Sequence, residues 1–85
     1  MYDYPIDYTW TTEEMIDVIA LYNAVEKAYE EGISKKEFLD AYKKYTTIID
    51  SKSMQKQYED AFYKVSKYSI YKVFVASKEN DWIKL

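Results

Sequence analysis

The stretch TTEEMIDVIALYNAVEKAYEEG, residues 11–32, encodes a complete amphipathic helix with a start signal, an apolar face and a stop signal. Thr11 and Glu14 form a T-x-x-E capping box, in which two residues exchange side chain–backbone hydrogen bonds at a helix start. Gly32 most easily takes the left-handed conformation that closes a helix. We therefore predict a helix over about residues 12–31, with one apolar stripe made of Met15, Val18, Ile19, Tyr22, Val25 and Tyr29.

The ten residues before this helix have a different pattern. Pro5 disfavours a helical conformation at Tyr4, and the segment shows no 3.6-residue spacing of apolar side chains. We therefore predict an extended arm over residues 1–10. The arm is rich in aromatic side chains, namely Tyr2, Tyr4, Tyr8 and Trp10.

Three further helices are predicted over about residues 35–49, 53–66 and 69–78. The first of them begins with a second capping box, Ser34 with Glu37, and its short linker favours an antiparallel hairpin with the preceding helix. The next helix carries one apolar face, formed by Met54, Tyr58, Ala61, Phe62 and Val65.

Residues 70–76, IYKVFVA, suit a strand by composition, but the chain offers no convincing second strand to pair with them. Because an isolated strand is unstable, we predict a short helix there. We expect the tail, residues 79–85, to fold back through Trp82, Ile83 and Leu85. The fold class is therefore all-α: a small irregular three- to four-helix bundle with an extended aromatic N-terminal arm, in one domain over residues 1–85.

Several common chemistries lack the residues they need. The chain has no Cys, no His and no Arg, so all 12 basic residues are lysines, and Gly32 is the only glycine. Thiolate catalysis, disulfides, haem and nearly every structural zinc site are excluded, as is a Gly-rich phosphate loop. We expect no cofactor, no metal site and no catalytic residue.

The carboxylates and lysines still allow two functional readings. Glu13, Glu14 and Asp17, with Asp3 and Asp7 before them, could form an oxygen-only cation site or serve a small enzyme, but stabilisation of the helix start explains them better. Residues 1–31 carry a net charge of −7 and the remainder +4. We expect the acidic first helix to pack beside the basic ones. The alternative is a weak nucleic-acid binder that uses Lys35, Lys36, Lys43, Lys44, Lys52 and Lys56.

The abundance of aromatic side chains favours a binding role. A small bundle cannot bury 11 Tyr, three Phe and two Trp, and exposed Tyr and Trp often dominate protein interfaces. The possible interaction surface comprises Tyr4, Tyr8, Trp10 and Trp82. The competing interpretation is that the arm folds across the first two helices and completes the core.

Several segments resemble uncharacterised protein family 0223, the YktA-like small cytoplasmic proteins of Gram-positive bacteria. They are YPID at residues 4–7, Trp10 with TEEM at 12–15, NAVEKAYE at 23–30, and YSIY at 68–71. The resemblance implies a small all-helical domain and no known catalytic residues. Lys67 stands where the resemblance leads us to expect a glycine, so we predict that the third and fourth helices are more continuous here.

We therefore expect a non-enzymatic protein-interaction or adaptor module, with an unknown protein partner or a second copy as its ligand. A nucleic-acid partner and a carboxylate-based enzyme are the weaker alternatives. The longest uncharged apolar run, residues 18–25, is far shorter than the roughly 20 residues that span a bilayer, and no secretory signal is visible. We expect no membrane association and a cytoplasmic protein.

Overall fold

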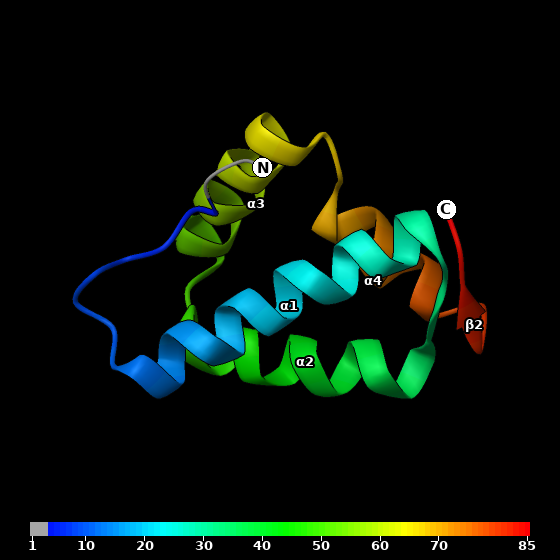
Figure 1. Cartoon of the computed structure of the whole chain (residues 1–85), viewed down its shortest axis with the longest axis horizontal. Helices are drawn as coiled ribbons and strands as arrows, with labels where there is room; N and C mark the ends of the chain where they lie inside the picture. The colour runs from blue at the N-terminus through cyan, green and yellow to red at the C-terminus, as the bar shows by residue number, and fades with distance from the viewer. Residues whose placement is uncertain (1–3) are drawn as a thin grey trace.

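The computed structural model describes residues 4–85, and it confirms the all-α fold class. In chain order, the elements are α1 (Thr12–Glu30), β1 (Ile33–Ser34), α2 (Lys35–Ile48), α3 (Lys52–Ser66), α4 (Ile70–Ser77) and β2 (Trp82–Ile83). Figure 1 shows the arm running back from the start of α1 toward α3, and β2 at the opposite end of the molecule. Tyr2 and Asp3 lie outside the described residues.

The predicted capping box starts α1. Thr11 Oγ1 accepts a hydrogen bond from the Glu14 amide at 3.1 Å, and Glu14 Oε1 accepts one from the Thr11 amide at 2.8 Å. At the other end Gly32 has a φ of +102°, and its amide donates to the Lys27 carbonyl at 2.7 Å. Both ends of the helix are thus fixed by local sequence.

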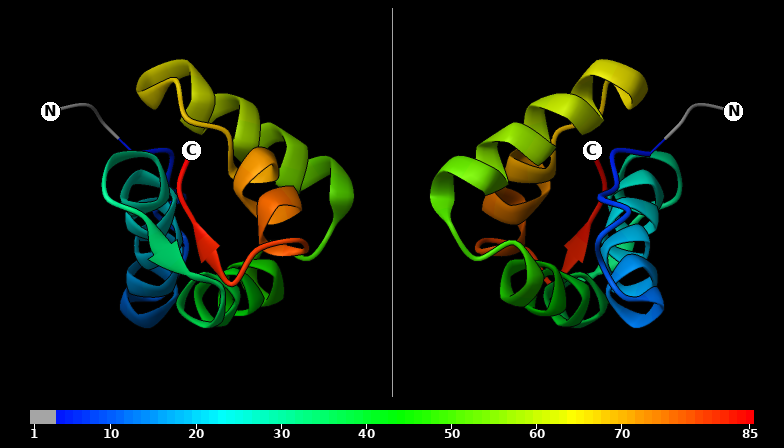
Figure 2. Two further views of the ribbon diagram at one scale, coloured as in Figure 1. Left: turned by 90° about the vertical axis from the view of Figure 1, so that its right-hand side faces the viewer. Right: turned by 90° about the vertical axis from the view of Figure 1, so that its left-hand side faces the viewer.

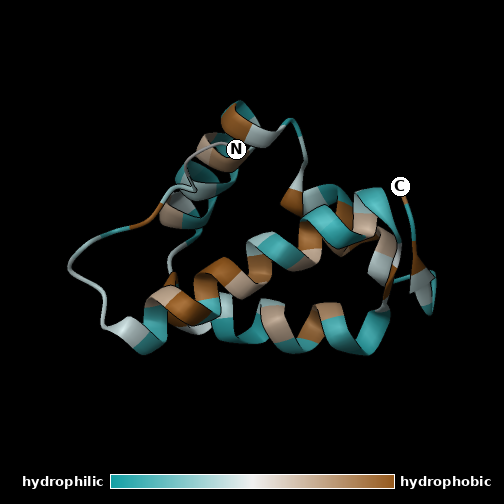
Figure 3. Ribbon diagram, viewed as in Figure 1, coloured by the Kyte–Doolittle hydropathy of each residue, from teal (hydrophilic) through white to brown (hydrophobic). Residues whose placement is uncertain are grey.

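The core forms where α1 and α2 pack as an antiparallel hairpin, as Figure 1 shows. The α1 residues Val18, Leu21, Tyr22 and Val25 are all 0% exposed. In Figure 3 the apolar colour follows the middle of α1. Each such buried side chain contributes about 1.5–3 kcal/mol through removal of apolar surface from water.

The second capping box is only half formed. Ser34 Oγ accepts from the Glu37 amide at 3.1 Å, as predicted. The Glu37 carboxylate instead forms an ion pair with Lys27 of α1, with an Nζ–Oε2 distance of 3.2 Å. Tertiary packing brings a cation within reach of this carboxylate, so Glu37 links the two helices across the hairpin.

A short strand pair, which the sequence pattern did not indicate, orders the C-terminal tail. β1 and β2 are antiparallel, with Ile33 opposite Ile83. Both isoleucines are buried, and the Leu85 amide donates to the Ala28 carbonyl at 3.0 Å. Two-residue strands are too short to show a period in the sequence, so only the folded chain reveals this pair.

The predicted continuity of the third and fourth helices is wrong. Lys67 takes the left-handed conformation, with φ 67° and ψ 14°, and its amide donates to the Tyr63 carbonyl at 2.7 Å. Ser69 then caps α4 by accepting from the Lys72 amide at 3.2 Å. A sharp break is therefore present without glycine, because the surrounding packing imposes it on a lysine.

Helix α3 is held by few buried side chains. Phe62 is its one fully buried apolar residue, whereas Met54 and Val65, expected on the same face, are 39% and 38% exposed. The views in Figure 2 show α3 inclined away from the α1–α2 pair. The apolar stripe of α3 is therefore longer than the surface available to cover it.

Lys67→Gly should stabilise the protein by about 0.5–1 kcal/mol, because a left-handed backbone costs a side chain-bearing residue about 1–2 kcal/mol and glycine almost nothing. Chemical denaturation measures the change. The control is Lys64→Gly in the last turn of α3, which should destabilise by about 1 kcal/mol. A loss of stability in Lys67→Gly would contradict the assignment of strain to this residue.

Candidate functional site

A groove of about 580 Å³ lies between α2, α3 and α4. One wall comes from α2 and α4 and is mainly aromatic: Tyr42, Tyr45, Ile70, Tyr71 and Phe74. The other wall comes from α3 and is polar: Lys52, Gln55, Lys56, Glu59 and Asp60. The groove thus has one face for apolar groups and one for charged groups.

The aromatic wall is preorganised by ring stacking. Tyr42 of α2 stacks on Phe74 of α4 with ring centroids 4.6 Å apart, and on Phe38 at 5.7 Å. Tyr42 and Phe74 are only half-buried, and Tyr71 at the rim is 62% exposed. Rings fixed in this way offer contact surface without losing much conformational freedom on binding.

The acidic groups of the polar wall are already engaged. Glu59 Oε1 accepts from Ser69 Oγ at 3.2 Å and from the Tyr71 amide at 2.9 Å, which joins α3 to the first turn of α4. Asp60 lies 3.9 Å from Lys56 Nζ in a largely exposed pair of the kind that contributes about 0–1 kcal/mol. Lys52 has no ion pair within residues 4–85.

The floor of the groove contains an unsatisfied hydroxyl group. Tyr45 is 2% exposed, and its hydroxyl has no hydrogen-bond partner within the described part of the chain. Burial, with smaller contributions from Tyr42 and Glu59, raises the pKa of Tyr45 far above its ordinary value. The phenol therefore stays protonated at neutral pH and cannot act as a base or nucleophile there.

The predicted acidic cluster does not form a metal site in the structure. Glu13, Glu14 and Asp17 line a separate hollow together with Lys44, and residues 4–85 hold no group of three acids placed to bind a metal ion. Burial, followed by the charge of Glu30, raises the pKa of Glu26, which accepts the Tyr4 hydroxyl at 2.9 Å. That carboxylate has a structural partner in the arm.

Two of the four proposed interface residues pack inward. Tyr4 lies 5.3 Å from the Tyr22 ring and 6.2 Å from the Phe62 ring, and its hydroxyl also donates to Asn23 at 2.9 Å. Trp10 lies 5.3 Å from the Tyr58 ring of α3. These side chains attach the arm to α1 and α3, as expected if the arm completes the core.

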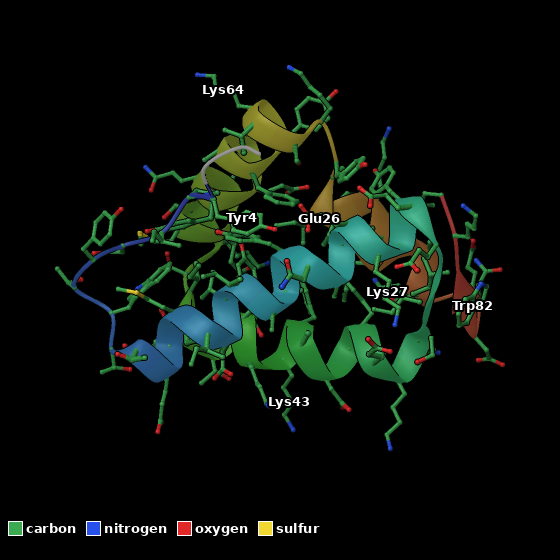
Figure 4. All side chains as sticks on the ribbon, viewed as in Figure 1. Tyr4, Glu26, Lys27, Lys43, Lys64 and Trp82 are labelled. Carbon is green, nitrogen blue, oxygen red and sulfur yellow. The ribbon has the colours of Figure 1, made fainter. Side chains whose placement is uncertain are left out.

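The other two residues of the possible interaction surface, Tyr8 and Trp82, are exposed but far apart. Tyr8 is 84% exposed in the arm, and Trp82 is 59% exposed in β2. Figure 4 shows Trp82 at the end of the molecule opposite the arm. Its indole lies against Gly32, where an added Cβ would be 2.5 Å from Nε1. The structure does not bring Tyr8 and Trp82 into one surface.

The lysines proposed for nucleic-acid binding do not share a face either. Lys44 lies among acids in the hollow by α1, whereas Lys52 and Lys56 line the groove. Lys43 is exposed on α2 and lines neither of these two hollows, and Figure 4 shows it projecting from the outer side of that helix. Lys44 is therefore separated from Lys52 and Lys56.

The groove was not found from the sequence. The signal that the sequence offers for a polar wall is the four-residue spacing of Lys52 and Lys56 on one side of α3. The angle between α3 and α4 creates the groove, and helix periodicity does not encode that angle.

None of the helices within residues 4–85 is both long and apolar enough to cross a bilayer.

Tyr4→Ala should lower the free energy of unfolding by about 2 kcal/mol, because it removes a half-buried ring and its hydrogen bonds. Tyr8→Ala in the same arm should change it by less than about 0.5 kcal/mol. Urea denaturation of both variants tests the packing of the arm. Equal effects of the two substitutions would contradict it.

Tyr45→Phe should raise the free energy of unfolding at neutral pH by about 1 kcal/mol, since it removes a buried hydroxyl that has no partner. Burial raises the folded-state pKa of Tyr22 and Tyr45, so their contribution to stability is fully present below pH about 10 and is lost as the pH rises further. Each such tyrosine contributes a slope of about −1.4 kcal/mol per pH unit. Tyr45→Phe should therefore flatten the alkaline loss of stability.

Parallel titrations of tyrosinate absorbance and helical circular dichroism measure this effect. The last part of the tyrosinate signal should develop only as the helices unfold. A complete tyrosinate signal from a chain with intact helices would contradict the burial of these two hydroxyls.

Comparison with known proteins agrees with the resemblance seen in the sequence. The model of the uncharacterised protein family UPF0223 matches residues 1–84. A UPF0223 protein of Bacillus pumilus is 50% identical over 80 residues, covering 94% of this chain and 90% of its own. One from Bacillus cytotoxicus is 44% identical over the same shares, and one from Staphylococcus aureus is 48% identical over 84% of this chain and 78% of its own. The chain therefore belongs to UPF0223, a family of uncharacterised proteins.

Proposed function

We propose that the protein is a non-enzymatic interaction module that binds a segment of a partner protein in the groove between α2, α3 and α4. The observation that carries the proposal is the pairing of a half-exposed stacked aromatic wall with a lysine-bearing wall. Aromatic side chains that are rigid before binding are the usual centres of protein interfaces. We place this partner in the bacterial cytoplasm.

A binding role fits the groove better than catalysis does. Glu59 is already occupied by two hydrogen bonds from α4, and the raised pKa of Tyr45 keeps its hydroxyl protonated. A general acid or base needs a pKa near the working pH and access to the substrate. Tyr45 does not meet the first requirement, and Glu59 already holds the first turn of α4.

The groove is also a better docking surface than the arm. Tyr4 and Trp10 use their rings to hold α1 and α3 together, so binding a partner through them would disrupt the core. Tyr8 is exposed but has no second exposed aromatic neighbour among the residues first assigned to this surface. The arm is therefore assigned to the fold and the groove to binding.

Photo-crosslinking in the native host tests this proposal. A benzoylphenylalanine placed at Tyr71 or at Lys56 lies on the rim of the groove, on α4 and α3 respectively. Both positions should crosslink to the same single protein. The matched controls are the same residue at Tyr8, which is exposed in the arm, and at Lys43, which is exposed on α2.

The proposal requires agreement between the two rim positions. Crosslinks to one common protein from Tyr71 and Lys56, absent from Tyr8 and Lys43, would support it. No crosslink at the rim, different products from the two rim positions, or equal yields at the control positions would overturn it.

A further inference from the structure

We infer that the segment bound in the groove is an acidic amphipathic helix, with its apolar face on the aromatic wall and its carboxylates facing Lys52 and Lys56. This inference rests on the proposed function, because it specifies the chemistry of the partner segment. Three properties of the groove support it: its backbone, its apolar wall and its two exposed lysines.

The backbone around the groove favours a helical occupant. All ten lining residues belong to helices α2, α3 and α4, and none belongs to a strand. At the start of α3 the Met54 amide donates to Ser51 Oγ, and at the start of α4 the Tyr71 and Lys72 amides donate to Glu59 and Ser69. An extended peptide would find no strand edge to pair with, whereas a helix satisfies its own backbone.

The apolar wall calls for an apolar face on the occupant. Ile70 and Tyr45 form a buried floor, the stacked Tyr42 and Phe74 rings rise half-buried above it, and Tyr71 is exposed at the rim. Apolar side chains that enter the groove would therefore lose water against the half-buried and exposed rings. Leucine-like or aromatic side chains at three- and four-residue spacing supply such a face.

The groove is lined by two lysines and two acids, which differ in the contacts that they already make. Glu59 is occupied by α4, and Asp60 is the weak partner of Lys56 at 3.9 Å. Lys52 is exposed and has no ion pair in the described residues, so it and the loosely held Lys56 are the ions still able to take a new partner. They lie four residues apart on one face of α3, the same spacing at which carboxylates recur on a facing helix.

A second copy of this chain is a poor occupant. Its acidic helix is α1, whose apolar residues Val18, Leu21 and Val25 are 0% exposed against the rest of the bundle. Ile16, at 59% exposed, is the largest apolar side chain that α1 leaves uncovered. Docking α1 into another molecule would thus require unfolding of its own core.

A small molecule is also a poor occupant. Small-ligand sites bury about 70–90% of the ligand surface. Here Lys52, Lys56, Asp60 and Tyr71 are all exposed, so the groove is open along its rim. A partner segment attached to a folded protein would cover this open side itself.

The experiment measures binding of two designed helical peptides to the full chain. Each has about 16 residues, enough for a stable helix, with leucines on one face. The acidic peptide carries glutamates beside that face, and the basic peptide carries lysines at the same positions. The wild type should bind the acidic peptide, and Lys52→Glu/Lys56→Glu should weaken this binding roughly three- to tenfold while strengthening binding of the basic peptide.

The control variant is Lys43→Glu/Lys44→Glu, which changes charge by the same amount on α2, outside the groove. It should retain affinity for the acidic peptide to within about twofold, since charges beyond a Debye length are largely screened at moderate salt. Chemical shifts of Tyr42, Phe74 and Tyr71 should change on binding. Their constancy in the presence of bound peptide would overturn the assigned site.

Other outcomes overturn the inference in identifiable ways. Equal binding of both peptides, or binding of neither, removes the acidic helix as the occupant. Self-association that Lys52→Glu/Lys56→Glu abolishes would place a second copy in the groove, and tighter binding of a single-stranded oligonucleotide would place a nucleic acid there. Crosslinking from Tyr71 and Lys56 to a common protein whose attached segment is not an acidic helix would overturn this inference and leave the proposed function standing. Absence of that crosslink would overturn both.

Discussion

The fold depends on the side chain of Tyr22, where three parts of the chain meet. Its ring stacks on Phe62 of α3 at 4.6 Å with the planes 9° apart, and it lies 5.3 Å from the Tyr4 ring of the arm. Its hydroxyl donates to the Pro5 carbonyl at 2.7 Å, so the polar end of a fully buried side chain is satisfied by the arm. The arm, α1 and α3 are thus joined through one residue. The hydrogen bond offsets the free-energy cost of removing the Tyr22 hydroxyl from water.

The same constraint explains why a groove exists. Phe62 is the one fully buried apolar residue of α3, so the buried attachment of α3 lies in its C-terminal half, next to Tyr4 of the arm. Its other face meets α4 mainly through Glu59, which accepts hydrogen bonds from Ser69 and Tyr71. The groove lies along residues 52–60 of α3, mostly before these two attachments, and the aromatic rings of α2 and α4 remain partly uncovered there. The candidate site is therefore a consequence of how few contacts hold α3 in place.

Local signals predicted the elements well but not their partners. The capping box of Thr11 and the closure at Gly32 required only neighbouring residues, and both formed as expected. Glu37 was expected to complete a second capping box, but it is paired with Lys27, ten residues away. Lys67 was expected to permit continuity, but it takes a left-handed conformation between α3 and α4, whose nearest buried residues are Phe62 and Ile70. Each error arose where a distant contact competed with a local preference.

The sequence by itself determined the helical class, the ends of α1 and the chemistries that the chain lacks, because these depend on residue type and short-range periodicity. Only the tertiary structure decided the rest. It assigned Tyr4 and Trp10 to the core, separated Tyr8 from Trp82, and placed Lys52 and Lys56 opposite the Tyr42–Phe74 stack. The physical reason is that side-chain orientation across helices depends on crossing geometry and on long-range ring contacts, neither of which has a signature in the order of residues along one helix.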